Sequence, residues 1–340
     1  MRGRGHGLRP RLLGSRPRPS VQPSTLYNKH SYCAAGGPSA HCGASEMNTI
    51  SVTPKFGDAV PDARAALCEI CAGDDALWRH LREEASAATA LEPALAGLLT
   101  GAVLNCESFG QAIVRRIAAR LGAPVVPAET IADAYFRALA AEPALVAAFR
   151  ADLTAIVERD PACARLLEPF LHFKGFHAVQ AHRLAHWLWG NGRRELALYL
   201  QSRSSEVFQT DIHPAAPFGR GVFLDHATGL VVGETAAVGD NVSLMQQVTL
   251  GGTGKVSGDR HPKVREGVLI GAGAKILGNI EIGRCSRVAA GSVVLQNVPH
   301  NVTVAGVPAK ILGPSGCREP ARDMDQLLSD IAYDAFSYVI

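Results

Sequence analysis

The stretch "VGETAAVGDNVSLMQQVTLGG" (Val232–Gly252) places an aliphatic residue at every sixth position: Val232, Val238, Leu244 and Leu250. A six-residue step matches neither the period of a helix nor the alternation of a strand. It is the period of a β-helix whose coil has three sides and buries the repeated side chains along its axis. The stretch therefore predicts a solenoid.

The same step continues on both sides of this stretch. Upstream it runs through Phe218, Leu224 and Leu230, with a shift of two residues before Val232. Neither intervening helices nor strand-type alternation separates these positions, which argues against a doubly wound sheet or an immunoglobulin-like sandwich. The sequence predicts a β-helix over residues 207–313, and its downstream repeat positions are Ile270, Ile276, Ile282, Val288 and Val294.

The pattern before the solenoid is helical, over residues 61–206. "DDALWRHLREEASAATALEPALAGLL" (Asp74–Leu99) begins with two Asp cap candidates and spaces Leu and Trp at helical intervals. Further alanine-rich segments follow, with breaks at Pro143 and at Gly190–Gly192. This composition predicts a compact α-helical domain ahead of the β-helix.

The net charge of +3 comes from the N-terminal region. Residues 1–45 hold six Arg and one Lys without an acid, which leaves 27 basic residues (34 minus 7) against 31 acidic ones. The charge therefore does not indicate nucleic-acid binding. A basic leader containing Ser and Pro is typical of an organellar transit peptide, so residues 1–50 are predicted to be a disordered chloroplast transit peptide. A mitochondrial address, or a cytosolic protein started at Met47, is the alternative.

Neither a membrane span nor a metal site is expected. The longest apolar run, Pro93–Leu104, is too short to cross a bilayer. Cys68 and Cys71 form a C-x-x-C without a second pair or a nearby His, so they are interpreted as buried, reduced thiols.

Two interruptions of the repeat carry histidine. "LDHATG" (Leu224–Gly229) holds His226, and the insertion "GTGKVSGDRHPKV" (Gly252–Val264) holds His261. Insertions in solenoids gather on the binding face. Histidine titrates near neutral pH, so His226 is predicted to be a general base. Taken alone, His226 is better explained as a surface residue at a corner of the coil.

These segments, together with "VERDPAC" (Val157–Cys163), "TDIHPAA" (Thr210–Ala216) and "IGAGAKILGNIEIG" (Ile270–Gly283), resemble the serine acetyltransferase family. The resemblance spans about residues 74–313 and the final "SYVI". It implies an α plus β solenoid: an N-terminal α-helical domain followed by a left-handed parallel β-helix of hexapeptide repeats. A hexapeptide repeat alone would imply only an acyltransferase.

The resemblance implies an acyltransferase that converts acetyl-CoA and L-serine to O-acetyl-L-serine and CoA, the first step of cysteine biosynthesis from serine, with cysteine as an inhibitor. The transfer is expected to be direct, because no Cys or Ser lies in the DHATG or DRHP motifs to form an acyl-enzyme. Acetyl-CoA is a co-substrate, and no cofactor or metal is implied. Alternatives are another hexapeptide acyltransferase, or a catalytically weak scaffold for the next enzyme.

Further site residues follow from the chemistry and the resemblance. Asp211 precedes His226 by fifteen residues, close to one coil, and the resemblance assigns it the orienting of that histidine. Arg260 offers a planar fork for the serine carboxylate, with His261 beside it. The resemblance also gives the substrate ammonium two carboxylates, Asp160 and Asp225.

Small residues in the coils suit the acetyl-CoA side of the reaction. Gly252 could donate its N–H to the tetrahedral oxyanion, with Thr253 next to it. The corner at Ala272 fits the family's pantetheine channel between coils. "GGTGK" (251–255) lacks the first Gly and the Ser/Thr of a P-loop, so a nucleoside triphosphate site is not expected.

Three other histidines are interpreted as structural. His182 and His186 have the spacing of a zinc pair, but the Glu of H-E-x-x-H is absent and Arg183 stands in its place. They are predicted to pack or to hydrogen-bond on a helix. His213 is predicted to lie at the start of the β-helix.

Two kinds of protein partner are predicted: other copies of this chain, and a second enzyme that binds the C-terminus. The resemblance implies trimers with active sites between neighbouring chains, and two trimers joined through the helical domains into a homohexamer. Residues 314–340 are aperiodic and are predicted to be a flexible tail. Its end, Ile340, is predicted to dock its side chain and carboxylate in O-acetylserine (thiol)lyase, with a frayed terminus as the alternative.

Overall fold

The computed structural model describes residues 74–254 and 257–327, and all of these belong to one compact unit. The predicted transit peptide, the Cys68–Cys71 pair and Ile340 lie outside the described residues. Within the described residues, each helix is too short or too polar to span a membrane.

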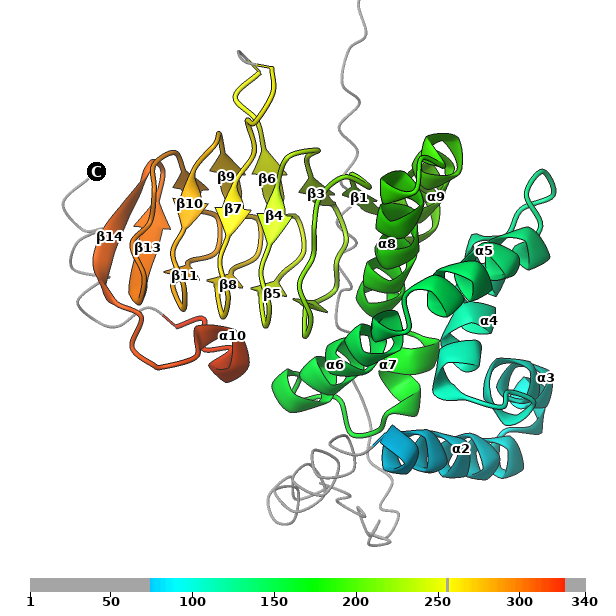
Figure 1. Ribbon diagram of the computed structural model, residues 1–340. Coiled ribbons are helices and arrows are strands. Elements are labelled where there is room, and N and C mark those ends of the chain that lie inside the picture. The colour runs from blue at the N-terminus through cyan, green and yellow to red at the C-terminus, as the bar shows by residue number, and fades with distance from the viewer. Residues whose placement is uncertain (1–73, 255–256, 328–340) are drawn as a thin grey trace, which may run out of the picture. The chain divides into compact units, whose positions relative to one another are not determined.

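Helices fill the first part of the described chain (Figure 1). The breaks between them follow local signals: the Ser108 hydroxyl accepts the Gln111 N–H at one helix start, Pro143 directly precedes another, and Gly192 adopts φ +75° where two helices meet. The helices are α2 (Asp74–Leu91), α3 (Ala96–Leu99), α4 (Phe109–Leu121), α5 (Ala128–Ala141), α6 (Ala144–Arg159), α7 (Leu167–Leu171), α8 (Lys174–Gly190) and α9 (Arg194–Phe208), with η1 (Pro93–Leu95) and η2 (Thr100–Leu104) between α2 and α4.

Short strands follow and form three sheets, which the chain visits in turn. The first sheet is β1 (Thr210–Ile212), β3 (Leu230–Val232), β6 (Thr249–Gly251), β9 (Lys275–Leu277) and β12 (Val293–Val294). The second is β4 (Ala237–Val238), β7 (Lys263–Val264) and β10 (Glu281–Ile282). The third is β2 (Phe223–Leu224), β5 (Ser243–Leu244), β8 (Leu269–Ile270), β11 (Arg287–Val288), β13 (Val302–Gly306) and β14 (Ala309–Pro314).

The six-residue period explains this topology. In the first sheet Val232 pairs in parallel with Leu250, Leu250 with Ile276, and Ile276 with Val294. Leu244 stacks in the same way on Ile270 in the third sheet. Each sheet therefore takes every third position of the repeat, and these side chains are buried along the axis of the coil. The predicted helical region and parallel solenoid are confirmed.

The helices dock on the first coil through close backbone contacts. Gly175 of α8 lies so near Leu224 that a Cβ built on it would fall 2.0 Å from the Leu224 carbonyl oxygen. The rings of His182 and His186 approach the carbonyl oxygens of Ala216 and Pro214 at 2.9 and 2.7 Å. These two histidines therefore hydrogen-bond from the helix to the coil, as predicted.

A buried ion pair reinforces this junction. Asp152 of α6 accepts two hydrogen bonds from Arg183 of α8, at 2.8 and 2.9 Å, and one from the backbone N–H of Val222 at 3.0 Å. Arg183 also donates to the Gly219 carbonyl at 2.7 Å. One carboxylate therefore connects two helices to the start of the solenoid.

The predicted flexible tail needs correction as far as Asp325. After β14 the chain returns to the coil through α10 (Pro320–Asp323), where the Ala321 N–H donates to the Gly267 carbonyl at 3.3 Å. The Ser243 hydroxyl donates to the Ala321 carbonyl at 2.8 Å, and Arg287 pairs with Asp325 at 3.0 Å. The segment lacks the repeat, but its backbone and one carboxylate find partners on the coil edge.

Candidate active site

His226 stands at a corner of the coil directly after β2. His226 and Ala227 have φ of +53° and +57°, a left-handed conformation that non-glycine residues rarely adopt. Short-range hydrogen bonds hold the turn, including Ala227 N–H to the Asp225 carbonyl at 2.6 Å. Lys174 of α8 contacts the Thr228 hydroxyl and so fixes the corner from the helical side. The His226 side chain is left 75% exposed and points outward from the core.

His226 shares a cavity of about 700 Å³ with Asp160 and Asp225. Asp160 ends α6, whereas Asp225 and His226 come from the corner after β2. His226 Nε2 lies 3.9 Å from Asp225 Oδ1. Burial raises the pKa of Asp225, and the nearby Asp160 carboxylate raises it further. Two carboxyl groups and an exposed imidazole therefore face one space, an arrangement suited to a substrate that carries an ammonium group beside a hydroxyl.

Arg260 and His261 lie at the end of the inserted loop between β6 and β7, where they contact the corner that follows β3. Arg260 donates to Glu234 Oε2 at 2.9 Å and to the Gly258 carbonyl at 2.9 Å. The His261 ring is buried against Gly233, where an added Cβ would fall 2.1 Å from Nε2. Burial and then the Arg260 guanidinium lower the pKa of His261, which favours the neutral form of this imidazole.

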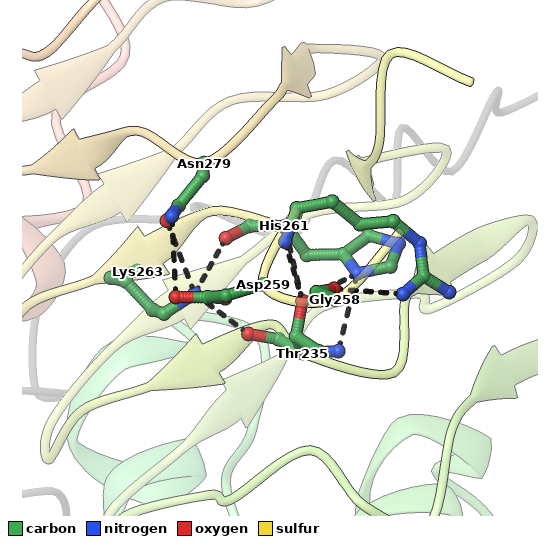
Figure 2. Close-up of polar contacts among 7 residues, drawn as sticks. Thr235, Gly258, Asp259, His261, Lys263 and Asn279 are labelled. Atoms are coloured by element: carbon green, nitrogen blue, oxygen red, sulfur yellow. Dashed lines mark hydrogen bonds and ion pairs between the residues drawn. The ribbon is translucent and has the colours of Figure 1, made fainter. Parts of the chain in front are cut away.

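The base of the inserted loop is a hydrogen-bonded cluster (Figure 2). Lys263 of β7 reaches Asp259 Oδ1 at 2.6 Å and the carbonyl oxygens of Thr235 and His261 at 2.8 Å. Asn279 donates to Asp259 Oδ2 at 3.2 Å. The cluster anchors the loop end that carries Arg260 and His261. Sequence analysis overlooked Thr235 and Lys263. The signal was available in the register, because β4, which follows Thr235, pairs with β7.

The three predicted acetyl-CoA residues are divided between the two corners. Gly252 lies beside Arg260, and its added Cβ would meet Arg260 Cγ at 3.4 Å. Thr253 follows it and packs near Gly278. Ala272 belongs to the other edge, where its carbonyl accepts the N–H of the next coil's corner, Gly291, at 2.8 Å. Within one chain, the sheet containing β3 separates the two groups.

Asp211 is not brought into contact with His226. It lies on β1, exposed, and accepts a hydrogen bond from Gln201 Nε2 at 2.6 Å. Its strand neighbour is Val231. Among the described residues no hydrogen bond joins Asp211 to His226, so its orienting role stays a prediction.

Two family models match the chain. One, described as "Serine acetyltransferase, N-terminal", covers residues 77–181, and the other, "Bacterial transferase hexapeptide (six repeats)", covers residues 261–296. Serine acetyltransferases of Salmonella typhimurium and Escherichia coli are 52% and 50% identical to the chain, each over 79% of this chain and 98% of the relative.

Solved structures of serine acetyltransferases also match the chain. A serine acetyltransferase from Brucella abortus in complex with coenzyme A is 60% identical, with a TM-score of 0.70, and the match covers 71% of this chain and 97% of that one. A serine acetyltransferase in complex with cysteine is 46% identical, with a TM-score of 0.74 and coverage of 75% and 100%. The enzyme of Neisseria gonorrhoeae in complex with serine is 51% identical, with a TM-score of 0.67 and coverage of 69% and 96%.

Proposed function

The chain belongs to the serine acetyltransferase family, and we propose that it transfers the acetyl group of acetyl-CoA to the hydroxyl of L-serine. The observation that carries the proposal is the cavity in which Asp160, Asp225 and His226 meet. Its two carboxyl groups suit the ammonium of an amino acid, and its imidazole suits the removal of a hydroxyl proton. Relatives solved with coenzyme A and with serine support both substrates.

We propose further that the parallel solenoid is a left-handed β-helix. Its support is the stacking of every third repeat position in three sheets, together with the hexapeptide family match. Corner residues with positive φ, such as Asn241, Gln247 and Cys285, turn the chain between sheets.

The proposed chemistry is a direct transfer. His226 takes the proton of the serine hydroxyl as that oxygen attacks the thioester carbonyl, which forms a C–O bond and a tetrahedral oxyanion. The C–S bond then breaks, the carbonyl re-forms, and the proton on His226 passes to the CoA thiolate. Asp160 and Asp225 hold the serine ammonium. The Gly252 N–H is the proposed donor to the oxyanion.

The separation of the two corners favours a site shared between chains. In a closed ring of three coils, the His226 corner of one chain can face the Arg260–His261 corner of the next. The neighbouring chain then supplies Arg260, the partner of the serine carboxylate. For Asp211 to orient His226, the two side chains would have to meet within this assembly. We propose such a trimer, paired through the helical region into a homohexamer.

The function is tested by measuring CoA release from acetyl-CoA with serine, homoserine and amino sugars as acceptors. Serine should give the largest kcat/KM, and millimolar or lower cysteine should inhibit by competing with it. A preference for homoserine or for an amino sugar would replace serine acetyltransferase with another hexapeptide acyltransferase.

Replacing Arg260 with alanine should raise the KM for serine about tenfold or more, because a bidentate charged partner of the carboxylate is lost. The KM for acetyl-CoA should change far less, and cysteine should inhibit more weakly. Arg265→Ala is the matched control, since Arg265 also pairs with a glutamate, Glu281, but on the exposed surface. A rise in the acetyl-CoA KM alone would assign this loop to the other substrate.

The C-terminus is proposed to bind O-acetylserine (thiol)lyase through Ile340. Deleting Ile340 should abolish that binding, because both the terminal side chain and the position of the carboxylate change. Acetyl transfer by the free enzyme should stay within about twofold of the wild type. Calorimetric titration with the lyase measures the difference, and equal affinities for intact and truncated chains would refute docking.

A further inference from the structure

We propose that Thr235 is a positioning residue for the serine site: it fixes His261 as the Nε2–H tautomer and holds the Arg260–His261 backbone against the coil. The proposal rests on the proposed function and deepens it. It names His261 Nε2–H as a hydrogen-bond donor to the amino-acid substrate. The presence of a histidine does not by itself tell which ring nitrogen carries the proton.

The tautomer follows from a single backbone contact. The Thr235 N–H donates to His261 Nδ1 at 3.2 Å. A backbone amide can only donate, so Nδ1 must accept and the proton of the neutral ring lies on Nε2. Nε2 makes no hydrogen bond to the described residues, and its proton is the donor that the proposal assigns to a carboxylate or hydroxyl of the substrate.

The Thr235 hydroxyl joins the same ring to the loop backbone. Its oxygen accepts the N–H groups of Arg260 and His261 at 3.0 and 3.1 Å. It also lies 2.9 Å from Nδ1 and bonds the Asp259 carboxylate, and toward either of these groups it can act only as a donor. One side chain therefore determines the position of two neighbouring substrate-binding residues.

Two further contacts make this geometry rigid. Lys263 Nζ bonds the carbonyl oxygens of both Thr235 and His261, so the corner and the loop share one cation (Figure 2). On the other side the ring packs on the bare Cα of Gly233. Gly233 does not have a positive φ, so an alanine there is acceptable to the backbone but must displace the ring.

Thr235→Val and Thr235→Ser test the hydroxyl directly. Valine keeps the shape and the backbone N–H but removes the acceptor for two amides, so the KM for serine should rise about tenfold while the KM for acetyl-CoA stays within about twofold. Serine restores the hydroxyl and should restore the KM for serine. Thr89→Val is the matched control, because it removes a hydroxyl that bonds only within α2.

Gly233→Ala provides a second, steric test that leaves every Thr235 group in place. It should raise the KM for serine to a similar extent. The inference is overturned if Thr235→Val and Gly233→Ala both keep the wild-type KM for serine, if both substrates are weakened equally, or if Thr235→Ser fails to rescue. A wild-type enzyme that releases no CoA with serine would instead refute the proposed function.

Discussion

Replacing His226 with alanine is expected to lower kcat by at least ~10²-fold, the usual effect of losing a general base. Without the imidazole, the serine hydroxyl must attack the thioester while still carrying its proton. The ring is exposed and buries little surface, so its removal should leave the fold and acetyl-CoA binding intact. Steady-state CoA release at saturating substrates measures the loss, and binding of acetyl-CoA by calorimetry checks the site.

His226→Asn separates chemistry from backbone strain. His226 has a positive φ, which asparagine tolerates better than alanine. Asparagine should therefore preserve the corner while losing as much activity as alanine. Asp211→Asn should lower kcat less than either variant, because only orientation is lost. Turnover near the wild-type rate in both His226 variants would eliminate the general-base mechanism.

Replacing Asp152 with alanine is expected to destabilise the protein by about 3–5 kcal/mol, the scale for breaking a buried ion pair from one side. Asp152 is fully buried, and its loss leaves the Arg183 guanidinium without a counter-charge and the Val222 N–H without an acceptor. Because these groups connect α6 and α8 to the first coil, unfolding should begin at this junction. Chemical denaturation followed by circular dichroism measures the loss.

Glu281→Ala is the matched control for Asp152→Ala. It breaks the pair with Arg265, in which both side chains are about half exposed, and should cost less than about 1 kcal/mol because water screens such pairs. The loss of stability in Asp152→Asn should lie between the losses in the two alanine variants, because asparagine keeps the shape of the side chain but removes its charge. Equal midpoints for Asp152→Ala and Glu281→Ala would show that the buried pair does not stabilise the junction.

The solenoid could be predicted because its contacts are periodic. Each coil pairs with the next at a constant separation in sequence, so the aliphatic positions from Val232 to Val294 indicate which residues stack. The same counting located the two interruptions and hence His226 and His261. Histidine in the first interruption predicted a general base, whereas the amino-acid substrate followed from the resemblance to the serine acetyltransferase family.

The remaining features depend on contacts that no local period encodes. Asp160 shares a cavity with Asp225 only because α6 and α8 dock together on the first coil, through the Asp152–Arg183 pair and the bare Cα of Gly175. The segment around Ala321 packs although it has no repeat, since its partners are backbone groups on the coil edge.

The arrangement of the site also required the tertiary structure. Counting residues suggested that Asp211 lies near His226, yet its side chain bonds Gln201, because direction along a strand decides which neighbour a carboxylate meets. The tautomer of His261 depends on the N–H of Thr235, a residue 26 positions away. The sequence supplied the period and the reactive residue types, whereas long-range packing alone decided which of those residues meet and which proton each one carries.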